Sequence, residues 1–247
     1  MHEISLKAEE ILRLGSWPVT NAVLLSAVSL LVLISLGLII KRKISLVPGK
    51  IQSLFELLLE QILKLMDPIL GNRHLSERYL PLIATIFLFI LTSNWLGLFP
   101  LIGPIGINIS EGDKHLFVPL LRSPASDLNF TIALAVISLI SINFLGILAL
   151  GFKRHASKFF TFKNPILSFV GLLELLSEFV KIVSFSFRLF GNVFAGEVLL
   201  LIVGFLVPYF IPLPFLFLEI FVGFIQAFIF SMLTLVFIAA AVKEEAH

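Results

Sequence analysis

The sequence predicts an all-α integral membrane protein, with about five membrane-embedded helices and one amphipathic helix on the membrane surface. Of its 247 residues, 58% are hydrophobic and only 14% are charged, whereas about a quarter of the residues of a soluble domain are charged. Five apolar stretches reach the roughly 20 residues that a helix needs to cross a hydrocarbon core about 30 Å thick. We find no soluble domain between them and expect one membrane domain over residues 1–247.

The apolar stretches set the five expected spans, and the first is expected to remain part of the chain. Its N-terminal flank lacks a basic region, and it ends in KRK at 41–43 rather than in a small-residue cleavage site, so it does not resemble a signal peptide. The spanning helices are expected at 18–40, 80–100, 129–151, 165–207 and 214–242.

An amphipathic helix is expected between the first two spans, at 49–67. Within IQSLFELLLEQILKLMD, polar residues recur at steps of three and four, opposite large apolar ones; they are Ser53, Glu56, Glu60, Lys64 and Asp67. A helix with two such faces lies along the membrane surface rather than crossing it.

The last two spans are expected to form a long tilted hairpin. About 43 residues at 165–207 would make some 64 Å of helix, twice the thickness of the hydrocarbon core, so this helix has to tilt steeply. A Pro-rich turn at 208–214 ends it and starts the return helix. The segment 100–127 is rich in Gly, Pro, Ser and Asp, so it is expected to be a loop too broken to span.

Charge and composition bear on orientation and partners. Basic residues gather in KRK at 41–43 and in KRHASK at 153–158; the positive-inside rule therefore places the N-terminus outside and the C-terminus in the cytoplasm. A net charge of +2 with 26 Phe but two Trp and two Tyr argues against a nucleic-acid partner. The chain has no cysteine, hence no disulfide, thiolate metal site or thiol nucleophile.

The fourth span carries a polar stripe at steps of three and four, formed by Glu174, Ser177, Lys181, Ser184, Arg188 and Asn192. Arg188 lies about 20 residues from either helix end, and an arginine at the bilayer centre costs about 2.5 to 3.5 kcal/mol. We therefore expect Arg188 to face protein or water. The alternative is a side chain that reaches back to the lipid headgroups.

Two carboxylates are expected to meet across the hairpin. Glu219 and Gln226 are seven residues apart, hence on one face of the fifth span. If Gln226 lies near Arg188 in the antiparallel pair, Glu219 falls near Glu197, because the two spacings nearly match. Two carboxylates in a low-dielectric site can share a proton, as a relay requires. The alternative is that each meets a polar loop or a headgroup.

Several segments together resemble one family. SFRLFGNVFAGE at 186–197 looks like the signature of subunit a of F-type ATP synthases, in which an essential arginine is followed by Asn four and an acidic residue nine positions on. The chain end QAFIFSMLTLVFIAAAVKEEAH, VPGKIQSLFELLLE at 47–60 and SNWLGLFP at 93–100 are similar to further segments of that family. The resemblance runs from about residue 16 to the C-terminus, in one order and topology.

The resemblance implies roles for single residues. Arg188 matches the essential arginine, Asn192 its neighbouring amide and Gln226 the glutamine that supports the arginine. Glu197 and Glu219 match two titratable positions that line an aqueous half-channel; the second is histidine in some members of the family. Weaker candidates for the proton pathway are Asp127, Asn129 and Ser184, while Asn94 and Asn143 suit helix packing as well as channel lining.

The resemblance further implies a stator subunit that provides two aqueous half-channels beside a ring of c subunits, whose rotation is coupled to ATP synthesis. The expected partners are the c-ring, the b-subunit peripheral stalk, other ATP synthase subunits, membrane lipid and transported H⁺, with Na⁺ still open. The chain would have no cofactor and no catalytic residue of its own, since it lacks a GxxxxGK[ST] loop. The bacterial plasma membrane is favoured over an organelle.

Three other functions stay open from the residues alone. A membrane scaffold would anchor other subunits but gives no reason for a buried arginine. A polytopic membrane enzyme would need a catalytic motif such as GxSxG or HExxH, and none occurs in a span. A different ion-coupled transporter would be favoured by inverted repeats, and none is evident.

Overall fold

The structure is a computed structural model that describes residues 8–14, 17–45, 47–99, 106–111, 114–157, 165–207 and 210–243. Five helices are long and apolar enough to cross a membrane, which confirms the predicted all-α membrane fold. The helices are α1 Asn21–Arg42, α2 Lys50–Leu70, α3 Arg73–Gly97, α4 Leu128–Leu150, α5 Phe152–Ser157, α6 Pro165–Leu206 and α7 Pro212–Lys243, with a 3₁₀ turn, η1, at Pro124–Ser126.

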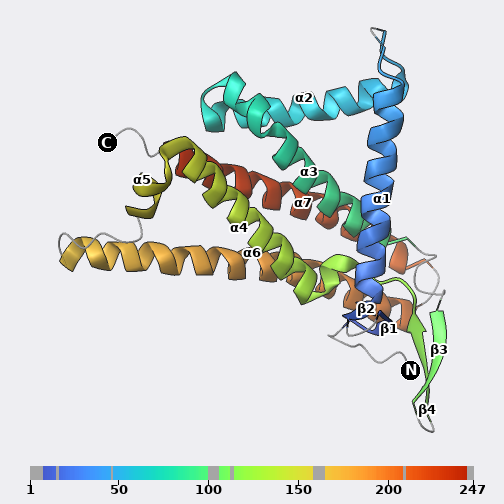
Figure 1. The fold of residues 1–247 in the computed structure, drawn as a ribbon. Helices are drawn as coiled ribbons and strands as arrows, with labels where there is room; N and C mark the ends of the chain where they lie inside the picture. Colours follow the sequence, from blue (N-terminus) through green and yellow to red (C-terminus); the bar gives the residue numbers. More distant parts are fainter. Residues whose placement is uncertain are drawn as a thin grey trace.

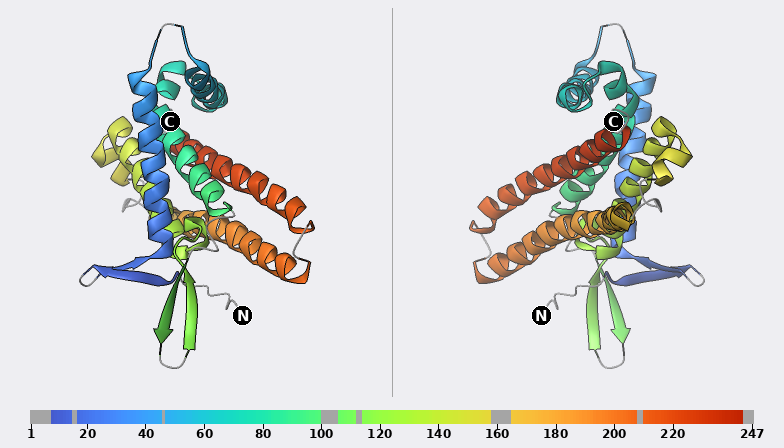
Figure 2. Two further views of the ribbon diagram at one scale, coloured as in Figure 1. Left: turned by 90° about the vertical axis from the view of Figure 1, so that its right-hand side faces the viewer. Right: turned by 90° about the vertical axis from the view of Figure 1, so that its left-hand side faces the viewer.

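The long helices do not run parallel to one another. Figure 1 shows α6 lying across the direction of α1, and both views of Figure 2 show α7 returning antiparallel beside α6. The C-terminal end of α1 and all of α2 lie at one end of the molecule (Figure 1). Two small β-hairpins lie at the opposite end. The hairpin of α6 and α7 is therefore present, and its tilt in a bilayer stays a prediction.

Local capping sets the helix ends more sharply than hydropathy does. The Thr20 side chain accepts a hydrogen bond from Val23 N at the start of α1. α2 runs past Pro68 to Leu70 and stops at Gly71, whose φ of 73° is the left-handed conformation that suits glycine. α3 begins at Arg73, after the cap Asn72, rather than at residue 80, because its first turns are polar and add nothing to an apolar run.

Two β-hairpins were not predicted. Strands β1 Glu10–Leu14 and β2 Trp17–Thr20 pair antiparallel. Strands β3 Gly106–Glu111 and β4 Lys114–Pro119 pair antiparallel from Gly106 opposite Pro119 to Glu111 opposite Lys114. The second pair lies in the segment expected to be a loop. Short strands rich in turn residues give too weak an alternation to be recognised beside spans of 20 residues or more.

The buried core lies where α3, α4, α6 and α7 meet, and its fully buried side chains include Ile83, Ile90, Leu189, Leu235 and Ile238. Two donors at the end of α3 bond to the backbone of α7. Asn94 Nδ2 donates to Gly223 O and Trp95 Nε1 to Ile220 O, each at 3.1 Å. Asn94 is thus a packing residue, one of the two roles the sequence left open.

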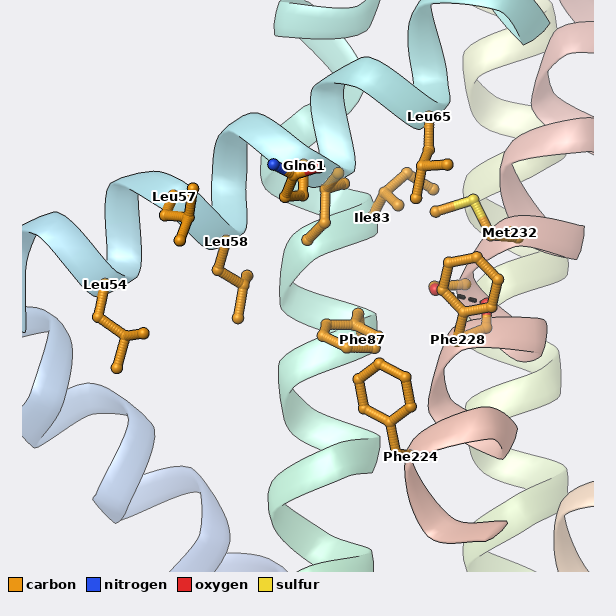
Figure 3. Close-up of a pocket in the computed structure, with 12 residues that line it drawn as sticks. Leu54, Leu57, Leu58, Gln61, Leu65, Ile83, Phe87, Phe224, Phe228 and Met232 are labelled. Atoms are coloured by element: carbon orange, nitrogen blue, oxygen red, sulfur yellow. Dashed lines mark hydrogen bonds between the residues drawn. The ribbon is translucent and has the colours of Figure 1, made fainter. Parts of the chain in front are cut away.

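A cavity of about 250 Å³ lies beneath α2, between it, α3 and α7 (Figure 3). Figure 3 shows leucines of α2 facing Phe87 of α3 and Phe224 of α7, whose rings meet edge to face with centroids 5.9 Å apart. The lining is almost all carbon. The apolar side of α2 therefore covers a hydrophobic space, as the amphipathic pattern predicts.

Candidate functional site

Arg188 lies near the middle of α6, at the border between a buried and an exposed face. Leu189 beside it is fully buried, whereas Phe187 is 55% exposed. The Arg188 guanidinium is half-buried and its Nη2 donates to Ser184 Oγ, one turn back, at 3.3 Å. Long side chains on a helix lean toward the preceding turn in this way. The stripe thus reaches a surface of α6 that the rest of the chain leaves open.

Asn192 and Gln226 join α6 to α7 one turn beyond Arg188. Asn192 Nδ2 donates to Gln226 Oε1 at 2.8 Å. Gln226 is 2% exposed, and its Nε2 has no hydrogen-bond partner among the described residues. Gln226 thus meets Asn192, one turn beyond Arg188, and the Arg188 guanidinium bonds to Ser184 on its own helix. The expected approach of Gln226 to Arg188 stays a prediction.

Glu219 lies one turn farther along, where its carboxyl group packs against Gly196. Glu219 is 7% exposed, and a Cβ atom added to Gly196 would overlap that carboxyl group. Since Glu197 follows Gly196 directly, the structure brings Glu219 next to the position expected for it. We call Arg188, Asn192 and Glu197 of α6, with Glu219 and Gln226 of α7, the polar seam.

A residue that sequence reasoning missed joins the polar seam from outside the hairpin. Arg122 precedes η1, and its Nε lies 3.8 Å from Glu197 Oε1. The signal available was a single arginine in LLRSPASD, immediately before a span and on the side where the positive-inside rule expects few basic residues.

Asp127 and Asn129 lie at the start of α4, and the hydrogen bonds between them are those of a helix cap. Asp127 Oδ1 accepts from Asn129 N at 3.0 Å and from Asn129 Nδ2 at 3.2 Å. Asp127 is buried and Asn129 exposed. Capping explains this arrangement, and the turn they follow, η1, contacts α6.

A second polar group lies on α6 toward its N-terminal end. Lys181 Nζ donates to Glu178 Oε1 at 2.7 Å and lies 4.7 Å from the centre of the Phe237 ring. Asn143 Nδ2 donates to Glu178 Oε2 at 3.4 Å, and Asn143 Oδ1 is 3.0 Å from His155 Nε2. These contacts link α4, α5, α6 and α7 and make Asn143 part of a partly buried hydrogen-bond network.

Together, fold and site define a polytopic α-helical membrane protein whose two longest helices carry a polar seam between them. Residues 23–239 match the family described as ATP synthase A chain. The chain belongs to the ATP synthase A chain family.

Relatives of similar length support this membership. The chain is 34% identical over 230 residues to an ATP synthase subunit a of Moorella thermoacetica, covering 93% of this chain and 94% of that protein. It is 35% identical over 241 residues to one of Mycobacterium bovis, covering 95% and 92%. It is 37% identical over 227 residues to one of Helicobacter acinonychis, covering 91% and 90%.

Proposed function

We propose that this chain is the stator subunit of an F-type ATP synthase that conducts protons past a ring of c subunits and is not itself an enzyme. The observation that carries the proposal is the order of contacts along the hairpin. Arg188 lies at the open face of α6, Asn192 bonds to Gln226 one turn on, and the Glu219 carboxyl packs against Gly196 after another turn. A fixed cation is thus followed by two hydrogen-bonded amides and by a carboxyl group able to carry a proton.

The exposed face of α6 suits a ring of helices. Phe179, Val183 and Phe187 on this face are 63%, 40% and 55% exposed, and they lie beside the stripe that holds Ser184 and Arg188. In lipid, such a face can pack against the apolar surface of other helices. We place the c-ring here, so that each of its carboxyl groups passes Arg188 as the ring turns.

Arg188 would act on the ring by electrostatics. A unit charge about 4 Å from a carboxylate is worth roughly 4 kcal/mol at an effective dielectric constant of 20, enough to drive proton release from a ring carboxyl that has been protonated in lipid. A guanidinium stays charged where a buried lysine could lose its proton. It therefore also separates the two half-channels.

The outer half-channel would contain Glu197 and Glu219, with Asp127 and Asn129 near its mouth; the other would open beside Lys181. This assignment places the N-terminus and both β-hairpins outside a bacterial plasma membrane, and the C-terminus in the cytoplasm. Both β-hairpins lie at the opposite end of the molecule from α2 and the C-terminal end of α1 (Figure 1), which supports this assignment. Each proton crossing 100 mV supplies about 2.3 kcal/mol for rotation. The b-subunit peripheral stalk completes the stator.

The test is ATP-driven acidification of vesicles that contain the reconstituted complex. Arg188→Ala is expected to abolish coupled pumping, while Arg42→Ala, which removes an exposed arginine at the end of α1, is expected to pump like the parent. Full pumping by an assembled Arg188→Ala complex would favour the scaffold function instead. Repeating the assay with and without Na⁺ identifies the coupling ion.

The orientation has its own test. Because the chain has no cysteine, single cysteines at Ser45 and Asn129 can be labelled without background by a membrane-impermeant maleimide. Cysteine at Asn129 is expected to react from outside intact cells, and cysteine at Ser45 only after the membrane is opened. The reverse pattern would overturn the proposed topology.

A further inference from the structure

A mostly buried arginine from outside the two long helices meets the polar seam at Glu197. The Arg122 side chain is 9% exposed, and its Nε lies 3.8 Å from Glu197 Oε1. The same Nε donates to Ser126 Oγ at 3.1 Å. A charged group taken this far out of solvent is stable only when it is paired and hydrogen-bonded. Arg122 is therefore held between Ser126 and Glu197.

The Arg122 side chain is held by a rigid part of the structure. Ser126 is fully buried, and its hydroxyl donates to Ser123 O at 2.9 Å. Ser123 in turn packs so closely against α3 that a Cβ atom added to Gly97 would lie 2.6 Å from Ser123 Cβ. The position of the guanidinium thus depends on the packing of η1, which contacts both α3 and α6.

The two oxygens of Glu197 have different surroundings. Oε1 faces the guanidinium of Arg122. Oε2 is buried and has no hydrogen-bond partner among the described residues. A carboxylate held through one oxygen keeps a defined orientation, and its other oxygen is left to accept or donate a proton. A positioned proton carrier exchanges faster than a freely rotating one.

The other charged groups at this end of the molecule do not replace Arg122. Glu219 on α7 and Asp127 at the start of α4 are both acidic. Glu9 precedes β1, and its carbonyl oxygen accepts from Asn21 N at the start of α1. The ends of α1 and α3 present the neutral amides of Asn21 and Asn94. Among the side chains that the structure describes at this end, Arg122 is therefore the cation that lies against Glu197.

We propose that Arg122 is a positioning residue for proton transfer, which holds one oxygen of the Glu197 carboxylate so that the other faces the polar seam. This inference rests on the proposed function of the seam. It adds Arg122, from the segment before η1, to the residues that support proton transfer at Glu197.

The experiment measures the rate of ATP-driven proton pumping by the reconstituted complex, with subunit content checked for each variant. Arg122→Gln is expected to lower pumping about tenfold to a hundredfold, as a displaced reacting group does. Arg122→Lys, which keeps a cation, is expected to restore a large part of the loss. Ser126→Ala, which frees the guanidinium but leaves both charges, is expected to lose about two- to tenfold. Arg42→Gln is the matched control.

A double substitution at Arg122 and Glu197 distinguishes a positioning role of Arg122 from a general loss of structure. Glu197→Asp draws the carboxylate back by one methylene, so adding Arg122→Gln to it is expected to cause little further loss. The inference is wrong if Arg122→Lys pumps no better than Arg122→Gln, or if the losses of Arg122→Gln and Glu197→Asp multiply. Should Arg122→Gln fail to assemble, Ser126→Ala decides: parental pumping by it overturns the inference. An active Arg188→Ala complex would instead overturn the function proposed for the whole seam.

Discussion

The carboxyl group of Glu219 on α7 packs directly against the backbone of Gly196 on α6. A methyl group at position 196 would occupy the space of the carboxyl group, so any larger residue there requires the Glu219 side chain or the helices to move. The close approach of α6 and α7 at this point depends on Gly196 having no side chain. The same contact keeps Glu219 beside Glu197, the next residue of α6.

Gly196→Ala is expected to force α6 and α7 apart or to displace Glu219. Overpacking of this kind costs about 1 to 3 kcal/mol, so both the thermal stability of the complex and its proton pumping should fall. Gly204→Ala is the matched control, since nothing lies within 4 Å of a Cβ atom placed there. Both quantities can be followed by heating the purified complex and by vesicle acidification.

A second substitution distinguishes crowding from loss of a proton carrier. Gly196→Ala with Glu219→Ala is expected to recover thermal stability, because the collision is removed, but not pumping. If Gly196→Ala alone proves as stable and active as Gly204→Ala, the packing described for this contact is incorrect.

The bond between Asn192 and Gln226 predicts a non-additive pair of substitutions. Asn192→Leu removes the donor to the amide oxygen of Gln226, a residue that is 2% exposed, at a cost of about 1 to 3 kcal/mol. Replacing both residues by Leu removes the unpaired amide and should recover part of this stability. Thermal unfolding of the four variants measures the coupling, and purely additive losses would contradict it.

The ion pair of Lys181 and Glu178 is expected to matter more than a similar pair on the surface. Its side chains are 17% and 16% exposed, whereas those of Lys64 and Glu60 are 57% and 54% exposed. Glu178→Ala should destabilise the complex by about 3 to 5 kcal/mol, because it leaves a charge of low exposure unpaired. Glu60→Ala should cost at most about 1 kcal/mol. Equal losses from the two changes would contradict this difference.

The turn from α2 to α3 is expected to loosen in acid. Ser76 and then Arg73, whose Nη1 lies 2.9 Å from Asp67 Oδ2, hold the pKa of Asp67 below its ordinary value of 3.8. The stabilisation is therefore present above that value and is lost as pH falls through the lowered pKa. Asp67→Asn should raise amide exchange at 67–76 at neutral pH and remove its acid dependence. Unchanged exchange in this variant would refute the assignment.

The spanning helices were predictable because hydropathy alone determines them. A bilayer requires about 20 apolar residues per span, and the five stretches meet this requirement whatever their packing. The amphipathic helix α2 followed from its period of three and four. Helix ends were less predictable, since α3 starts at a cap, Asn72, that lies in a polar segment.

The site was predictable only where its residues share a helix. The spacing of Glu219 and Gln226 placed them on one face, and the resemblance at 186–197 pointed to Arg188. The partner of Gln226 could not be fixed by spacing, because the turn between α6 and α7 sets the register. Arg122 lies 75 positions before Glu197 in the sequence, and no periodicity links a loop residue to a helix so far away.

The two hydrogen bonds from α3 to the backbone of α7 stiffen the hairpin of α6 and α7 against sideways force. Asn94 and Trp95 grip the carbonyl groups of Gly223 and Ile220, just after Glu219, and Gly223 lets α3 come close enough to do so. A rotor dragging against α6 would push this hairpin sideways. Because α7 is hydrogen-bonded to α3 close to Glu219, such a force would be transmitted to the rest of the subunit. The hairpin of α6 and α7 would then bend less.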